Sequence, residues 1–348
     1  MKILNYKLNA IMAKARAMYG QRLTGEDYDS LVACTSLAEL VTCLKAKAPY
    51  AAAFESVSAT QSEAGYIEFI IRKRAYNRFV SLYRYEMTLG EGFSDYFIVK
   101  EEVKQILSCI KSILLNNTEK YVINMPSFYE KSLHFDVKSL MGVRTLEQLS
   151  RLLEGTPYKK LTDKGIADGY SYTEFESDLI SYFNEFEYDL VNKNCKGKEK
   201  KQMMALLAET ADMKFADKLY RLKKYFPANK ALLSVIAPSH LTAFSHKEIK
   251  ALINAENEKQ VLEILSGTLY RGYVREIEKN VHIEQAINQV RYRKIKSLLR
   301  FSTDPNVVMF CFMLLTENET DNLIHITEGI KYGINQEEIR ALLIGVGD

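Results

Sequence analysis

Long stretches of this chain repeat apolar residues at positions i, i+3, i+4 and i+7, which places them on one face of an α-helix. This spacing runs through residues 66–89, 99–115, 172–190, 200–226 and 274–299. Turn-forming residues are scarce, with 6 prolines and 16 glycines in 348 residues. Sandwiches and barrels need a turn signal about every 8–12 residues. The pattern therefore predicts an all-α fold built from long amphipathic helices.

Several shorter helices are marked by capping sequences at their starts. Thr24, Ser36, Ser245 and Asn335 are each followed three residues later by an acidic residue. A side-chain oxygen at such a position accepts from the unpaired amides of the first helical turn, and the acid suits the helix dipole. We expect a helix to begin directly after each of them.

An internal repeat is the most informative feature of the sequence. Residues 23–50, 133–158 and 244–270 share one layout, in which two short amphipathic helices are joined by a turn and followed by a tyrosine. Leu31 and Leu140 are 109 positions apart, and Leu140 and Leu252 are 112 apart. The other positions that share the layout are Leu40, Leu149 and Val261, then Leu44, Leu153 and Leu265, and finally Tyr50, Tyr158 and Tyr270.

Any two amphipathic helices match at some offset, but several shared positions, a shared length and a shared tyrosine favour a true repeat. A unit of about 110 residues is too long for a solenoid. The sequence predicts three similar helical domains at about 1–118, 119–228 and 229–348, and the chain can interleave them.

Charge and hydropathy exclude several classes of protein. The 47 basic and 44 acidic residues give a net charge of +3, divided as +3, +1 and −1 among the three predicted domains. No third is basic enough to predict nucleic acid as the partner. No apolar run approaches the roughly 18 residues of a membrane span, and charges interrupt the N-terminal segment where a signal peptide would need an apolar core. We expect a soluble intracellular protein.

The sequence contains few of the motifs that mark catalytic sites. No phosphate-binding loop, nucleophile elbow or zinc-binding His pair occurs, and five cysteines without a CxxC pair predict reduced core thiols. An acidic stretch could form a carboxylate pair, but a solvated helix face explains it better. A lysine run follows it and is either an electrostatic docking patch or an exposed linker. The acidic residues are Glu174, Glu176, Asp178, Glu185, Glu187 and Asp189, and the lysines are Lys193, Lys196, Lys198, Lys200 and Lys201.

Three segments carry a family resemblance. They are Leu23-Thr-Gly-Glu-Asp-Tyr28 with the following Ser36-Leu-Ala-Glu-Leu40, the helix 211–226 with Asp212 and the ending Arg221-Leu-Lys-Lys-Tyr225, and the Glu- and Asn-containing segment 317–333. Together they resemble the C subunit of bacterial and archaeal V-type (A-type) ATPases, in a family that includes the eukaryotic d subunit. The chain departs from the family pattern at residues 214–216, where an asparagine is usual.

The resemblance implies a non-catalytic rotor part without a cofactor or metal. Three helical domains would form a funnel whose narrow side sits on the proteolipid ring and whose socket receives the central shaft made by the D and F subunits. The protein would lie at the cytoplasmic face of the membrane and touch it only through the ring, while torque passes between the ATP-hydrolysing head and the proton- or sodium-carrying ring.

Two basic groups are the candidate docking residues, and both could equally be ordinary surface charge. They are Arg221, Lys223 and Lys224 in one segment, and Arg291, Arg293, Lys294 and Lys296 in another. Two other functional hypotheses stay open. One is a helical adaptor or scaffold unrelated to rotary ATPases, and the other is an enzyme that uses the acidic stretch.

Overall fold

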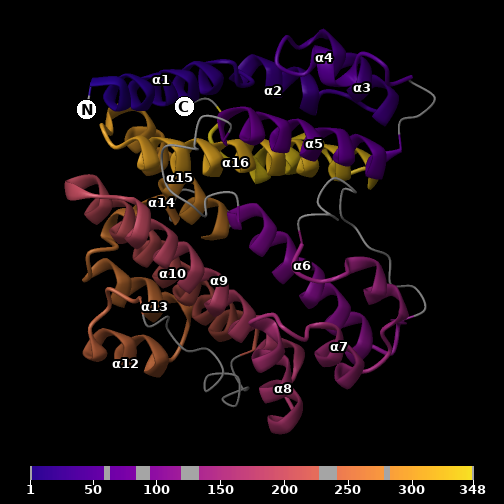
Figure 1. Cartoon of the computed structure of the whole chain (residues 1–348). Helices are drawn as coiled ribbons and strands as arrows, with labels where there is room; N and C mark the ends of the chain where they lie inside the picture. The colour runs from indigo at the N-terminus through magenta and orange to yellow at the C-terminus, as the bar shows by residue number, and fades with distance from the viewer. Residues whose placement is uncertain are drawn as a thin grey trace. The chain divides into compact units, whose positions relative to one another are not determined.

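The computed structural model describes residues 2–58, 63–83, 95–118, 133–226, 241–277 and 283–346. Every regular element within these ranges is a helix, which confirms the all-α prediction for the described part of the chain (Figure 1). The chain forms two compact units, and each is described here by itself. Unit 1 comprises Met1–Glu91, Asn194–Leu206 and Thr268–Asp348, and unit 2 comprises Gly92–Lys193 and Leu207–Gly267.

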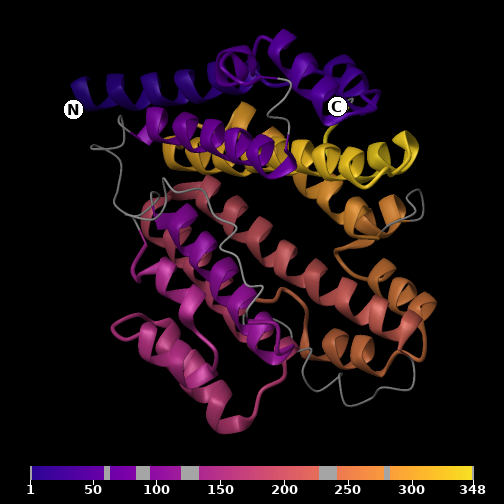
Figure 2. The same cartoon turned by 90° about the vertical axis from the view of Figure 1, so that its right-hand side faces the viewer.

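Unit 1 is built around one long buried helix, α16 (Pro305–Lys331). Its apolar residues face all sides, so it can be stable only when other helices surround it. Helices α1, α5 and α15 pack against α16, and α5 runs alongside it in both Figure 1 and Figure 2. The other helices of unit 1 are α1 (Lys2–Gly20), α2 (Gly25–Val32), α3 (Leu37–Ala46), α4 (Ala51–Phe54), α5 (Ala64–Tyr83), α14 (Arg271–Ile277), α15 (Ile283–Phe301) and α17 (Gln336–Leu342).

Unit 2 has its core between α6 and a series of shorter helices. Ile106 and Ile110 of α6 are buried with Leu140, Leu149 and Tyr158 from the segments that follow. Helix α10 begins in unit 1 and ends in unit 2. The helices of unit 2 are α6 (Asp95–Leu114), the 3₁₀ helix η5 (Val137–Gly142), α7 (Leu146–Leu152), α8 (Tyr158–Asp168), α9 (Tyr172–Asn194), α10 (Gly197–Tyr225), α12 (His246–Asn254) and α13 (Glu258–Ser266).

Four of the five predicted long helices occur near the predicted bounds, as α5, α6, α9 and α10. The last part of the first one, residues 84–89, lies outside the described residues. The prediction of one helix over 274–299 was wrong, because the structure has α14 and α15 there and the two pack against each other. Both helices bury apolar residues at helical spacing, so the periodicity alone did not reveal the break.

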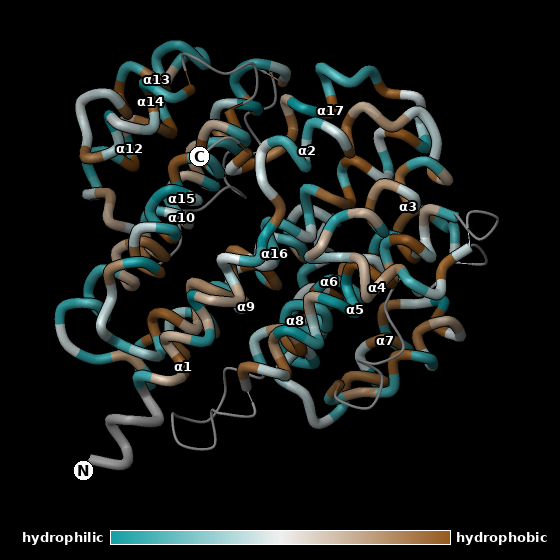
Figure 3. Tube along the Cα trace, turned by 90° about the horizontal axis from the view of Figure 1, so that it is seen from above, coloured by the Kyte–Doolittle hydropathy of each residue, from teal (hydrophilic) through white to brown (hydrophobic). Residues whose placement is uncertain are grey.

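The four predicted capping sequences are confirmed. Thr24 and Ser245 each form a reciprocal capping box with the acid three residues later. The side chains of Ser36 and Asn335 likewise accept from the backbone amides of Glu39 and Glu338. Figure 3 shows hydrophilic and hydrophobic stretches alternating along most helices, as expected for amphipathic elements.

Each of the three segments with a shared layout contains a pair of short helices. The pairs are α2 with α3, η5 with α7, and α12 with α13. In the second pair the first member is a 3₁₀ helix instead of an α-helix. The final tyrosines Tyr50, Tyr158 and Tyr270 are all buried.

Candidate functional site

The first basic group, on the last turns of α10, is held by contacts within unit 2. Arg221 Nε lies 3.0 Å from Asp217 Oδ1, one turn earlier. Lys223 is half-buried, and its Nζ donates to the carbonyl oxygen of Ile253 in α12 at 2.9 Å. Lys223 therefore ties α10 to α12, which is a structural role.

Lys224 is exposed at the end of α10. Its Nζ lies 5.5 and 5.2 Å from the ring centres of Tyr220 and Tyr225, and a hydrogen bond with Tyr225 raises the pKa of its ammonium. Tyr225 and Phe226 are 62% and 61% exposed. The end of α10 thus presents a lysine together with exposed aromatic surface, and aromatic side chains are enriched at protein interfaces.

The second basic group lies on α15 in unit 1 and contacts mainly α14 and its own helix. Arg293 Nη1 is 3.1 Å from Glu276 Oε2, and Lys294 Nζ is 5.1 Å from the ring centre of Tyr273, both on α14. Lys296 Nζ is 5.8 Å from the ring centre of Tyr292. The Nε of Arg291 is buried without a hydrogen-bond partner. The two predicted groups belong to different units, so nothing here joins them into one surface.

A buried carboxylate that the docking prediction missed organises unit 1. Glu319 of α16 accepts from the backbone amide of Leu23 at 3.2 Å and from the hydroxyl of Tyr50 at 2.8 Å. Its Oε1 also lies 3.2 Å from Arg74 Nη1 and 3.8 Å from Arg78 Nη1. Burial and the nearby Glu319 carboxylate raise the pKa of Tyr50, which keeps this phenol a hydrogen-bond donor.

Unit 2 contains a second carboxylate of the same kind. Glu102 of α6 is fully buried, and its Oε1 accepts from the backbone amide of His134 at 2.5 Å. Its Oε2 accepts from the hydroxyl of Tyr158 at 2.8 Å. Burial, and then Glu102, raises the pKa of Tyr158 well above its usual range.

A third buried carboxylate, Asp212 of α10, lies beside the segment that precedes α12. It accepts from the hydroxyl of Thr242 and, at 2.9 Å, from the backbone amide of Ala243. Thus Leu23, His134 and Ala243, each one or two residues before a helix cap, donate their amides to a carboxylate from a long helix. Buried amides and acids need such partners, so these contacts fix each short-helix pair on its long helix.

Members of the acidic stretch on α9 have local partners and differ in burial. Glu174 accepts from the backbone amide of Ser171 at 2.7 Å and caps the helix. Asp178 lies 2.9 Å from Lys164 Nζ and accepts from Tyr170. Glu187 is buried, whereas Glu185 and Asp189 are exposed. Each of these contacts has a local structural purpose.

Metal-ligand clusters, membrane spans and cysteines were the other features considered in the sequence. No group of three or more metal-ligating side chains occurs in the described ranges. No helix there combines the length and the apolarity that a membrane-spanning segment requires. All five cysteines are free thiols, and four of them are buried, which agrees with the expected core role.

Comparison with known proteins agrees with the resemblance seen in the sequence. The family model described as ATP synthase (C/AC39) subunit matches residues 11–342. The C subunit of the A-type ATP synthase of Desulfurococcus sp. is 23% identical over 338 residues, covering 95% of this chain and 88% of that protein. The corresponding C subunit of Thermococcus kodakarensis is 23% identical over 334 residues, covering 94% and 88%.

A third relative, the C subunit of the A-type ATP synthase of Pyrococcus abyssi, is 25% identical over 262 residues, covering 73% of this chain and 68% of that protein. The identities are low, but the family model spans nearly the whole sequence and includes most of both units. The chain belongs to the ATP synthase (C/AC39) subunit family.

Proposed function

We propose that this chain is a non-catalytic central-stalk subunit of a V-type or A-type rotary ATPase. It would couple the shaft made by the D and F subunits to the membrane proteolipid ring during proton or sodium transport. The observation that carries the proposal is the family match over residues 11–342, together with relatives named as the C subunit of A-type ATP synthases over most of their length. The protein would lie peripherally at the cytoplasmic face of the membrane.

We further propose that the chain is a threefold repeat of similar helical domains arranged as a funnel, near 1–118, 119–228 and 229–348 with interleaved ends. The recurring contact between a buried carboxylate and the start of a short-helix pair supports this proposal. The interleaving is supported by Glu319, because this C-terminal residue serves the first pair. The similar spacings between Leu31, Leu140 and Leu252 in the sequence also support a threefold repeat.

A coupler must transmit torque without deforming, and the contacts of the buried carboxylates suit that task. Each one joins residues far apart in the sequence, as Glu319 joins α16 to Tyr50, Arg74 and Leu23. Breaking such a contact leaves a buried charge without its partner, which has a high free-energy cost. The long helices and these cross-links together would give the protein its stiffness.

Binary binding assays test the proposal. The full chain should bind the purified D–F shaft, and separately the detergent-solubilised ring. Charge reversal of Lys223 and Lys224 should weaken one of these contacts, but Lys223 also bonds Ile253, so Lys224→Glu alone is the cleaner variant. Lys250→Glu, on an exposed position of α12 in the same unit, is the matched control.

Loss of affinity with Lys224→Glu and not with Lys250→Glu would support the end of α10 as a docking face. Equal affinity of both variants for shaft and ring would remove this candidate. A folded chain that binds neither partner would contradict the rotor proposal and leave a helical adaptor as the alternative.

A further inference from the structure

The lysine run that follows the acidic stretch has a place in unit 1 that the sequence did not reveal. The backbone amide of Lys196 donates to Asp304 Oδ2 at 3.0 Å, and Thr303 Oγ1 bonds Glu199 Oε1 at 2.8 Å. Asn306 donates to the carbonyl oxygen of Asn194. The start of α10 is therefore fastened to the turn between α15 and α16.

The end of α15 lies directly before that turn and ends in an unusual residue. Phe301 is 78% exposed, the largest exposed fraction among the exposed large apolar side chains of the described residues. Arg16 donates to the carbonyl oxygens of Leu299 and Ser302, and these two residues are buried. Phe301 is thus held outward between two anchored neighbours.

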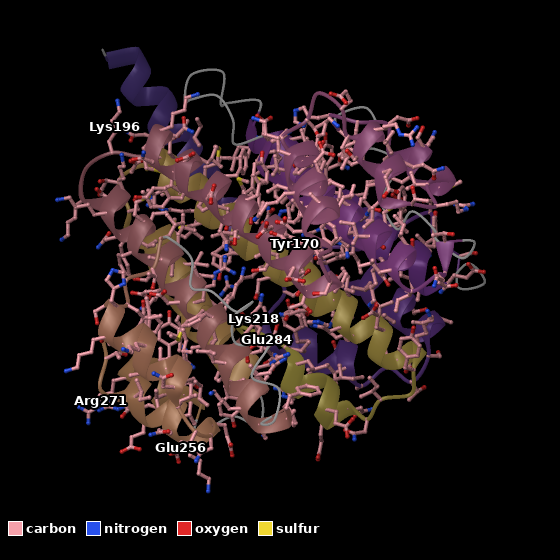
Figure 4. All side chains as sticks on the ribbon, turned by 90° about the horizontal axis from the view of Figure 1, so that it is seen from below. Tyr170, Lys196, Lys218, Glu256, Arg271 and Glu284 are labelled. Carbon is pink, nitrogen blue, oxygen red and sulfur yellow. The ribbon has the colours of Figure 1, made fainter. Side chains whose placement is uncertain are left out.

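Cations lie close to Phe301 in the sequence and on the start of α10, which is fastened to the turn that follows Phe301. Lys196, Lys198, Lys201 and Arg300 are exposed, and Figure 4 shows Lys196 at an outer edge of the view. With Lys200, these segments carry five cations and two carboxylates. Glu199 accepts a hydrogen bond from Thr303, and Asp304 accepts from the backbone amides of Lys196 and Asn306. We call the residues Lys196, Lys198, Lys200, Lys201, Arg300 and Phe301 the basic-aromatic corner.

Arg293 and Lys294 extend the corner along the exposed face of α15. One side of the helix carries positions 293, 297 and 300, which follow one another at spacings of four and three residues. Positions 294 and 301 are seven residues apart and lie next to them. Residues 293, 294, 300 and 301 are all exposed, and Arg293 forms its ion pair with Glu276 of α14. The exposed side of α15 near its end therefore carries the cations Lys294 and Arg300 and the apolar side chain of Phe301.

We propose that the basic-aromatic corner binds the surface of an anionic phospholipid bilayer, a direct membrane contact in addition to the contact through the ring that the family resemblance implies. Clusters of about 4–8 Lys and Arg residues attract anionic headgroups, and an aromatic side chain among them enters the interface. Within residues 194–206 and 283–306, all of them described, Phe301 is the one exposed large apolar side chain. An interface with a folded acidic protein would need an apolar centre, which a single ring does not provide.

Vesicle sedimentation with the full chain tests the proposal, using equal parts phosphatidylglycerol and phosphatidylcholine, or phosphatidylcholine alone. The chain should bind the anionic vesicles at low salt, release them as salt rises, and leave the neutral vesicles unbound. The double variant Lys198→Gln with Lys201→Gln should bind about 25-fold more weakly, because each cation near an anionic surface contributes about fivefold.

The matched control is Lys247→Gln with Lys250→Gln, two exposed lysines at the same three-residue spacing on α12. It should bind within about twofold of the parent chain. A second readout uses the absence of tryptophan from the chain, since Phe301→Trp introduces a single reporter. Its emission should shift to shorter wavelength with anionic vesicles and stay constant with neutral ones.

Three results would overturn the proposal: no binding to anionic vesicles, equal weakening by the control pair, or unchanged emission from Phe301→Trp when the chain sediments. Binding of the corner to an acidic polypeptide in place of vesicles would also overturn it and assign the corner to an acidic protein. The vesicle assay needs no other protein, so its failure is distinguishable from a failure to bind ring or shaft.

Discussion

Replacing Glu319 with glutamine removes the charge at the centre of unit 1 while keeping the size of the side chain. In the parent protein the Glu319 side chain is 9% exposed, and those of Arg74 and Arg78 beside it are 11% and 13% exposed. Glutamine also turns one accepting oxygen into a donor. In either orientation of the glutamine amide, its NH₂ group faces another donor. That donor is the backbone amide of Leu23 in one orientation, and the Tyr50 hydroxyl and Arg74 guanidinium in the other.

The expected loss follows from the two largely buried guanidinium groups that remain, those of Arg74 and Arg78. Removing one partner of a buried ion pair costs about 3–5 kcal/mol, because the other charge stays buried without compensation. Typical domains unfold with about 5–15 kcal/mol. We therefore expect Glu319→Gln to remove about 3–5 kcal/mol from the unfolding free energy of unit 1, a large part of the total.

Amide hydrogen exchange measures this loss unit by unit, which a melting curve of the whole chain would not. Exchange in residues 23–50 and 64–83 should accelerate more than about 100-fold. Residues 146–168 of unit 2 should keep their rates and serve as the internal reference. Glu328→Gln, an exposed position on the same helix, is the control and should change stability by less than about 0.5 kcal/mol. An acceleration below about tenfold in residues 23–50 would refute this reasoning.

Three further predictions concern packing, pH and thiol reactivity. A Cβ on Gly165 would lie 2.1 Å from the Phe175 ring, so Gly165→Ala should destabilise unit 2 by about 1–3 kcal/mol in urea unfolding. Gly272→Ala, where a Cβ meets nothing, should not be destabilising, and equal effects would contradict the close packing. Hydrogen bonds from Ser245 lower the pKa of Glu248, so its stabilising effect is complete above the usual value of about 4.3 and is lost as pH falls through the lowered pKa. Glu248→Gln should therefore flatten the acid side of the stability curve, and an unchanged slope would refute this. Burial raises the pKa values of Cys109 and Cys195 to about 12, so these two thiols should resist iodoacetamide in the native chain and react once it is unfolded in urea. Labelling of either thiol at the unfolded rate in the native chain would show that it is accessible.

The helices could be predicted well from the sequence because local rules determine most of them. The caps at Thr24 and Ser245 satisfy their own helix ends, so a few neighbouring residues suffice. The break between α14 and α15 could not be predicted in this way. Apolar residues are buried at helical spacing within each helix, and the packing of α14 against α15 shows that there are two helices instead of one.

The buried carboxylates can be recognised in the sequence by their positions on the apolar faces of their helices. Glu102 stands three residues after Val99 and four before Ile106, on the apolar face of α6. Asp212 similarly precedes the buried Phe215 and Ala216 by three and four residues. An acid at a core position must find donors, and such a position predicts a buried contact even though its partners are distant in sequence.

Contacts between distant segments account for what could not be predicted. The lysine run at 196–201 has no local feature that would bring it to the turn after Phe301, since the hydrogen bonds that join it to Thr303 and Asp304 span about a hundred residues. Lys223 likewise looked like surface charge, and its bond to Ile253 depends on how α10 and α12 pack.

The central claim is that one chain links shaft and ring, and a bridging assay tests it most directly. The detergent-solubilised proteolipid ring is immobilised, and the purified D–F shaft is added with or without this chain. The proposal predicts that the ring retains the shaft only when the chain is present, with all three in one complex. Retention of the shaft without the chain, or its loss when the chain is bound to the ring, would contradict the coupling role.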